Sequence, residues 1–256
     1  MIALTDGLVT VAFTLIRPLG LTLLFPLLNT RSLGSALIRN GVLLALIIPM
    51  LPLVYKQAAP LRGWGLLERV PGELLIGVIL GFCAAIPFWA VDMAGFLIDT
   101  LRGATMGSVY NPSMAMQTSL FGLLFSQFLC ALFFLGGGIN LLLSALYDSY
   151  RAFPPGTTLA LDRRLFDFIL TQWQLLYCLC LSFSLPAVLS MILADLALGL
   201  INRSARQLNV FFLSMPIKSA LALLLLLVSL PYAFHHYLQE TETLYQALTK
   251  AWLWHG

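Results

Sequence analysis

The ionisable residues of this chain do not form a pattern typical of a catalytic site. Four carboxylates within apolar sequence are scattered, and none lies two or three residues from a potential base: Glu73, Asp92, Asp99 and Asp195. His235 and His236 are adjacent, so on a helix their side chains point to different faces. Motifs of zinc proteases, serine hydrolases and nucleotide-binding loops are absent. The sequence therefore indicates no enzyme, although an intramembrane protease or a lipid-modifying enzyme stays open as an alternative.

The cysteines also give no indication of a metal or redox site. All four lie inside apolar runs, none forms a CxxC pair, and no histidine is near them in sequence: Cys83, Cys130, Cys178 and Cys180. We interpret them as small buried hydrophobic side chains. The sequence predicts no metal and no cofactor.

Polar side chains within apolar sequence are the second feature of possible functional importance, because they are expected to be buried. Arg17 lies in the first apolar block, 8–28, beside Pro18, whose missing N–H frees a backbone carbonyl that the arginine is expected to use. An arginine at mid-membrane costs about 2.5–3.5 kcal/mol on insertion scales, which surrounding apolar residues can offset. Arg17 is therefore expected to face protein, with snorkelling from a shifted span as the alternative.

A helix face of small residues is predicted in the block 71–91, which begins with Pro71 in its first turn. Glu73, Gly77 and Gly81 recur every four residues, which places them on one face. Glycines four residues apart let another backbone approach closely, so this face is predicted to contact protein. Together with Arg17 and Asp195, Glu73 belongs either to a relay of ionisable groups or to buried pairs that only fix packing.

The stretch 92–119 interrupts the apolar sequence near its middle. It contains four methionines, three glycines and the turn pair Asn111-Pro112. Gly103 and Gly107 loosen the backbone, and methionine side chains adapt to changing partners. We interpret this stretch as a pliable loop that occludes a passage inside a membrane-embedded assembly. The alternative is an ordinary connection between two spans.

The elements that must position these residues belong to a membrane protein. The 256 residues are 60% hydrophobic and only 10% charged, and the mean hydropathy is +0.92, well outside the soluble range. A net charge of +3, with no basic cluster larger than the pair Arg163-Arg164, excludes an electrostatic nucleic-acid footprint. The composition therefore predicts an integral membrane protein that binds membrane lipid and no nucleic acid.

About six hydrophobic segments are expected, since a span needs about 20 apolar residues: 8–28, 41–55, 71–91, 120–147, 165–201 and 219–234. Gly136–Gly138 should break the fourth segment. The fifth would reach about 55 Å as a straight helix, against a hydrocarbon core of about 30 Å, so Pro186 is expected to make it a bent helix or a hairpin. Broken helices at membrane depth need protein around them. The predicted fold class is an all-α polytopic membrane protein with kinked helices, in one domain over residues 1–256 with an amphipathic tail at 235–256.

One segment carries a family resemblance. The run Gln207–Phe211, followed by Pro216-x-Lys218 and preceded by Gly199 and Arg203, resembles the signature of the FliR/SpaR/SctT family of export-apparatus membrane proteins of type III secretion. Other positions agree over about residues 10–235: Arg17, Pro26, Arg39, Glu73, Gly77, Gly81, Gly95, Arg102, Gly103, Gly137, Gly138, Pro154, Gly156, Pro186 and Asp195. Three positions depart from the family pattern, and they favour a virulence-type member over a flagellar one: Arg206, Ile139-Asn140 and Asn111.

The resemblance implies a function. The chain would be a subunit of the type III export gate in the bacterial inner membrane, multi-pass and partly held above the bilayer, helping to form and close the pore for unfolded substrate proteins. Implied partners are SctR-type and SctS-type gate subunits, an SctU-type switch protein and an SctV-type export gate. A proton-coupled small-solute transporter is the alternative.

The resemblance also assigns a plug role to the loop at about 103–119. Its predicted sealing residues are Met106, Tyr110, Asn111, Pro112, Met114 and Met116. A separate hypothesis gives assembly or buried polar roles to Arg17, Glu73, Gly77, Gly81, Asp195, Arg203, Gln207, Asn209 and Lys218.

Overall fold

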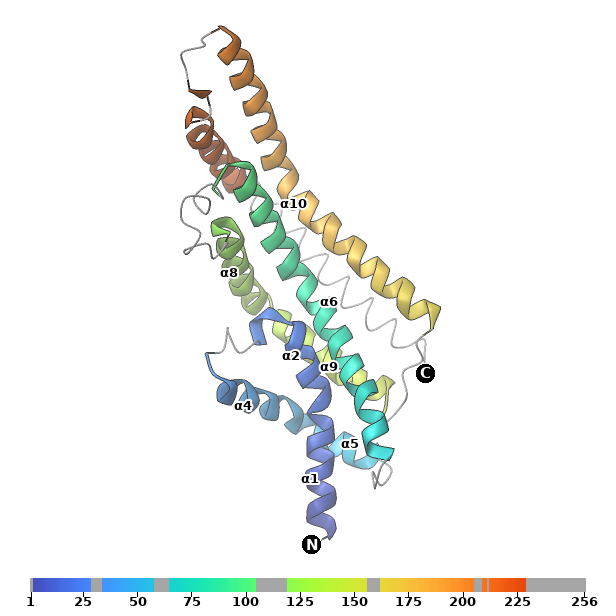
Figure 1. Cartoon of the computed structure of the whole chain (residues 1–256). Helices are drawn as coiled ribbons and strands as arrows, with labels where there is room; N and C mark the ends of the chain where they lie inside the picture. The colour runs from blue at the N-terminus through green and yellow to red at the C-terminus, as the bar shows by residue number, and fades with distance from the viewer. Residues whose placement is uncertain are drawn as a thin grey trace. The chain divides into compact units, whose positions relative to one another are not determined.

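The computed structural model describes residues 2–28, 34–57, 65–104, 119–155, 162–204, 209–210 and 212–228. Every regular element in these ranges is helical (Figure 1). The chain divides into two compact units. Of the described residues, the first unit comprises those up to 86 and 133–172, and the second comprises 87–132 and 173–228. The prediction of an all-α protein is confirmed.

The first unit begins with a series of short helices. These are α1 (Ile2–Thr14), α2 (Ile16–Leu24), η1 (Pro26–Leu28), α4 (Ala36–Ile47), η2 (Ile48–Met50) and α5 (Leu51–Gln57). Their apolar side chains meet in a core that includes Phe13, Phe25, Ile47 and Val54, each at most 2% exposed. The ring of Phe25 lies 5.9 Å from that of Phe133, which joins the start of the chain to the end of α8.

Helix α6 (Gly65–Leu101) is longer at both ends than the sequence predicts. It begins before Pro71, so the expectation that this proline opens the helix is wrong. It also continues through Asp92–Leu101, so the first ten residues of the central stretch are helical and do not belong to a loop. The hydrophobic burial of Ala94 and Ile98, both 0% exposed, accounts for the extension because it continues the packed face of the helix.

The glycine triplet breaks the next apolar segment, as predicted. Helix α8 (Leu120–Leu135) ends before it, α9 (Gly138–Ala152) begins within it, and the two axes differ by 71°. Gly137 has φ +75°, a left-handed conformation that costs a glycine little. Gly138 faces the ring of Phe133, where a Cβ would lie 2.4 Å from a ring carbon, so the bend also needs a residue without a side chain.

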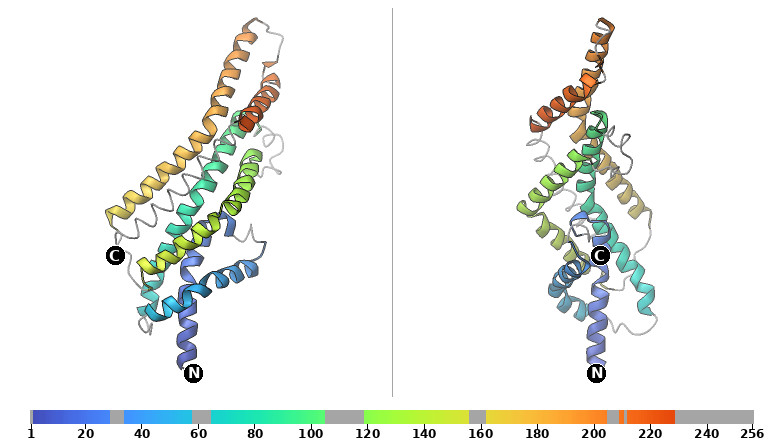
Figure 2. Two further views of the ribbon diagram at one scale, coloured as in Figure 1. Left: turned by 180° about the vertical axis from the view of Figure 1, so that it is seen from behind. Right: turned by 60° about the vertical axis from the view of Figure 1, so that its left-hand side comes forward.

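Helix α10 (Arg163–Ser204) is uninterrupted in both Figure 1 and Figure 2. It continues through Pro186, so the hairpin alternative for this segment is excluded. Proline in a long apolar helix removes one backbone hydrogen bond, a loss that the many remaining bonds of a 42-residue helix can offset. A last described helix, Phe212–Val228, lies beside the end of α6 in the second unit (Figures 1 and 2).

Two helices are long and apolar enough to cross a membrane: Arg69–Leu101 and Arg163–Ser204. The bent pair α8 and α9 adds a third if it counts as one span. Three shorter apolar helices complete the set: Val9–Leu24, Ala36–Met50 and Phe212–Val228. Among the described residues the six predicted hydrophobic segments are thus all present as helices, but at most three have the length of a full span.

Candidate functional site

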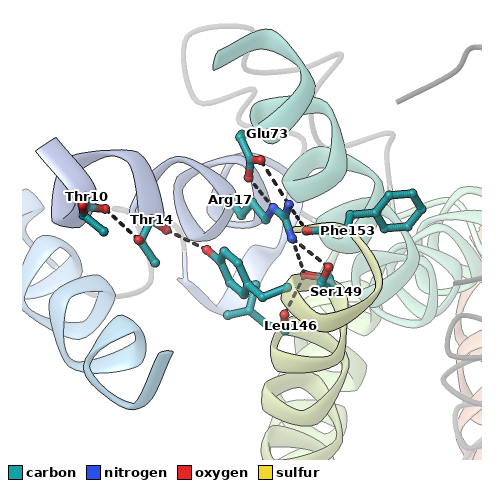
Figure 3. A network of polar contacts seen from close by, with 8 residues as sticks. Thr10, Thr14, Arg17, Glu73, Leu146, Ser149 and Phe153 are labelled. Carbon is teal, nitrogen blue, oxygen red and sulfur yellow. Dashed lines mark hydrogen bonds and ion pairs between the residues drawn. The ribbon is translucent and has the colours of Figure 1, made fainter. Parts of the chain in front are cut away.

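Arg17 and Glu73 form a buried ion pair in the first unit (Figure 3). Arg17 lies on α2 and is 0% exposed, and Glu73 lies on α6 and is 1% exposed. Arg17 Nε donates to Glu73 Oε2, and Nη2 donates to Oε1 at 3.1 Å. This fork of parallel bonds is the strongest arrangement between a guanidinium and a carboxylate, and it fixes the orientation of both helices.

The remaining donors of Arg17 reach the end of α9. Nη1 donates to the Ser149 carbonyl oxygen at 2.8 Å, and Nη2 donates to the Phe153 carbonyl oxygen at 2.6 Å (Figure 3). The last carbonyls of a helix carry partial negative charge, so a cation there is favourable, and the Ser149 carbonyl binds it in addition to the N–H of Phe153 at 2.9 Å. The guanidinium carbon also lies 4.4 Å from the centre of the Tyr150 ring, a cation–π contact. One arginine therefore joins α2, α6 and α9.

The carbonyl that Pro18 frees has a different partner from the one expected. Proline at position 18 cannot donate to the Thr14 carbonyl oxygen one turn earlier. The hydroxyl of Tyr150 donates to this oxygen at 2.7 Å (Figure 3). The expectation that Arg17 would use this carbonyl is wrong because its donors are taken by Glu73 and by the end of α9.

The glycine face of α6 contacts the backbone of α2. A Cβ added at Gly77 would lie 2.1 Å from the Arg17 carbonyl oxygen, and one added at Gly81 would lie 2.4 Å from the Leu21 carbonyl oxygen. Gly20 on α2 returns the contact, since its added Cβ would lie 2.6 Å from the Leu74 carbonyl oxygen. The helices thus touch through their backbones, and this approach brings Arg17 within reach of Glu73.

Asp195 and Lys218 form a second ion pair, within the second unit. Lys218 Nζ lies 2.5 Å from Asp195 Oδ2 and donates to the Leu101 carbonyl oxygen at 3.3 Å. The lysine side chain is 13% exposed and the aspartate 50% exposed. The lysine of the Pro-x-Lys motif therefore binds the last carbonyl of α6, immediately before the central loop.

Several predicted residues do not join these clusters. Arg203, in the last turn of α10, and Asn209 are exposed. Gln207 lies outside the described residues, as do the six predicted plug residues, all within 105–118, and the tail 235–256. None of the described residues form a group of three or more side chains that could hold a metal ion.

The described residues on both sides of the central loop meet at Asp99, which the sequence did not single out. Ser119 Oγ, just after the loop, donates to Asp99 Oδ2 at 2.7 Å, although the two residues are 20 positions apart. Two signals in the sequence could have indicated this site. Asp99 and Arg102 have the spacing of a helical ion pair, and Ser119 stands where a helix N-cap is favoured.

Comparison with known proteins places the chain in a family. The model of the family "Bacterial export proteins, family 1" matches residues 8–244. The chain belongs to this family. A relative from Salmonella typhimurium, "Secretion system apparatus protein SsaT", is 57% identical over 94% of both chains. "Yop proteins translocation protein T" of Yersinia pestis is 39% identical over 86% of this chain and 85% of the relative. "Flagellar biosynthetic protein FliR" of Bacillus subtilis is 32% identical over 63% of each.

These findings confirm the predicted family and the virulence-type assignment, because the two secretion-system relatives named here are 57% and 39% identical to the chain, against 32% for the flagellar one. This export protein is an all-α membrane protein and a subunit of a type III secretion export apparatus. The alternative of a proton-coupled solute transporter is not supported, since the family is one of export proteins. The family consists of structural components of export apparatuses, and its members are not known as enzymes.

Proposed function

We propose that this subunit helps to form the export pore of a type III secretion apparatus and closes it with the loop 105–118. The observation that supports the proposal is the bond from Ser119 to Asp99, which brings the two ends of this loop to one place. The described residues that precede and follow the loop thus lie close together. Its sequence contains three methionines, one tyrosine and no charged residue.

Such a composition suits a seal that must re-form. Methionine side chains are flexible, and dispersion contacts between apolar groups are not directional. A closed pore would therefore be filled by Met106, Tyr110, Met114 and Met116 without a fixed polar lock. Asn111-Pro112 would turn the chain at the tip. A passing unfolded chain displaces such a seal, which closes again behind it.

The proposed setting is the bacterial inner membrane, with several passes through it. The partners would be SctR-type and SctS-type gate subunits, with an SctU-type switch protein and an SctV-type export gate nearby. In this reading the Arg17–Glu73 pair and the glycine face of α6 keep the first unit in the shape that these partners bind. Arg203 and Asn209 are exposed and available for contacts with them. The position of Gln207 in the family motif assigns it to the same role.

The closing role is tested by replacing residues 105–118 with a short Gly/Ser linker while keeping Gly103 and Ser119. The assembled complex with its natural partner subunits is purified and placed in planar bilayers. We expect a raised conductance for small ions, because the linker lacks the apolar side chains that fill the pore.

The matched control replaces residues 156–161, which connect α9 and α10, with a Gly/Ser linker of the same length. This complex should conduct like the natural one. An unchanged conductance after replacement of 105–118, in a complex of normal composition, would rule out the closing role.

A further inference from the structure

The end of α6 is shaped so that the loop begins at a defined point. Gly103 has φ +87° and donates through its N–H to the Thr100 carbonyl oxygen at 3.1 Å. The N–H of Ala104 donates to the Asp99 carbonyl oxygen at 3.0 Å. These are the two bonds of a Schellman motif, which ends a helix at a left-handed glycine. Gly103, which the sequence suggested as a source of looseness, is thus the residue that stops α6.

The start of α8 is fixed from α6. The N–H of Phe121, in the first turn of α8, donates to Asp99 Oδ2 at 3.0 Å, and Ser119 Oγ donates to the same oxygen at 2.7 Å. Ser119 Oγ in turn accepts from the N–H of Gly122 at 2.8 Å, as an N-cap does. A carboxylate at a helix N-terminus satisfies donors that the helix cannot and interacts favourably with its dipole. Asp99 therefore caps a helix to which it does not belong.

Arg102 completes the arrangement. Its Nε donates to Asp99 Oδ1 at 2.7 Å, so each oxygen of the carboxylate is held by a different segment. The guanidinium carbon lies 4.4 Å from the centre of the Phe121 ring on α8. The Asp99 side chain is 3% exposed and that of Arg102 is 14% exposed, so solvent screens the contact little. All of these groups lie in the second unit.

We propose that Asp99, with Arg102 and Ser119, forms a clasp that sets the position of the loop 105–118 in the pore. Asp99 is a positioning residue in this proposal, which rests on the closing role of the loop. The 14 residues 105–118 connect Ala104 to Ser119, so any change in the distance between these two residues changes where the loop can place its side chains in the pore. The clasp fixes the described residues on both sides of the loop relative to each other.

The test compares three substitutions that leave the loop sequence intact: Asp99→Asn, Arg102→Gln and Ser119→Ala. Asparagine keeps the shape of aspartate, but its amide group cannot accept from donors on both sides. Each variant is assembled with its natural partner subunits and placed in planar bilayers. We expect small-ion leakage to rise about tenfold for Asp99→Asn, since hydrogen bonds to a charged group account for shifts of this order, and less for the other two.

The matched control is Asp148→Asn. Asp148 forms an ion pair with Arg151 at the same three-residue spacing, but this pair is exposed and both its members lie on α9. The control should leak like the natural complex. A second comparison introduces Asp99→Asn into the protein whose residues 105–118 are replaced by the linker. If Asp99 acts by positioning the loop, this combination leaks no more than the linker replacement alone.

The outcomes separate the clasp from the closing role. If linker replacement raises leakage and all three clasp variants conduct like the natural complex, the clasp proposal is overturned, while the closing role of the loop is supported. If Asp99→Asn adds leakage in the linker background, it acts on the fold and not through the loop, which also overturns the proposal. Failure of all three variants to assemble overturns it too, because the clasp would then be a folding requirement. If linker replacement itself has no effect, the closing role fails first.

Discussion

At the scale of the residue, Arg17 illustrates how a charge is kept inside an apolar structure. Its desolvation is offset by Glu73 and by two carbonyls at the end of α9, so every direction of the guanidinium fork has an acceptor. A buried pair of this kind adds little net stability compared with a well-packed apolar pair. Breaking it is costly because the remaining charge stays buried without its partner.

The prediction at this scale is that Glu73→Ala destabilises the isolated chain by about 3–5 kcal/mol, because Arg17 loses its counter-charge. Thermal unfolding of the purified protein in detergent measures the change. The double variant Glu73→Leu with Arg17→Met should recover part of the loss, since no uncompensated charge remains. Equal losses in the single and double variants would show that the pair does not depend on mutual charge compensation.

At the scale of the element, the contact between α2 and α6 depends on backbone approach. Gly20, Gly77 and Gly81 leave no space for a Cβ at the crossing. The ion pair and the glycine face are therefore one feature, because the helices must touch for Arg17 to reach Glu73. The glycines carry an entropic cost in a helix, which the packing offsets.

We expect Gly77→Ala to destabilise the isolated chain by about 1–3 kcal/mol, since its Cβ would collide with the Arg17 carbonyl oxygen and separate the helices. Gly199→Ala on α10 is the matched control, because nothing lies within 4 Å of its added Cβ. This change should stabilise the protein by about 0.5–1 kcal/mol through helix propensity. Thermal unfolding in detergent compares the two, and a loss at Gly199 as large as at Gly77 would contradict the argument.

At the scale of the whole molecule, the two long helices differ in how far the chain itself covers them. In the most apolar window of each, 72% of residues are buried for Arg69–Leu101 but only 28% for Arg163–Ser204. Large apolar side chains of α10 are left uncovered by this chain, among them Leu193 at 65% exposed. Such a surface needs apolar surroundings, either lipid or another subunit.

The prediction at this scale uses two neighbouring positions on α10. Met191 is 1% exposed, so Met191→Ala should destabilise the isolated chain by about 2–5 kcal/mol. Leu193→Ala should change the stability by less than about 0.5 kcal/mol but lower the amount of partner subunits that co-purify with the chain. Unchanged co-purification would indicate that lipid, and not a partner, covers this face.

The sequence by itself determined the membrane character, the helical segments, the break at Gly136–Gly138 and the family. These features depend on local composition, on glycine and proline, and on a motif of contiguous residues, all of which are visible in the order of the chain. The spacing of Glu73, Gly77 and Gly81 also indicated a contact face, because helical periodicity is a local property.

Only the tertiary structure decided which groups are partners. Arg17 binds carbonyls more than 130 positions away on α9, and Asp99 caps a helix that begins after the loop. A single sequence contains no record of such distances, since any buried arginine has several acceptors to choose from. The continuity of α10 through Pro186 excludes the hairpin, one of the two forms expected for this segment. The length of α6 was misjudged for a related reason. Local breaking signals were outweighed by the packing and the many backbone bonds of long helices, which form only in the folded protein.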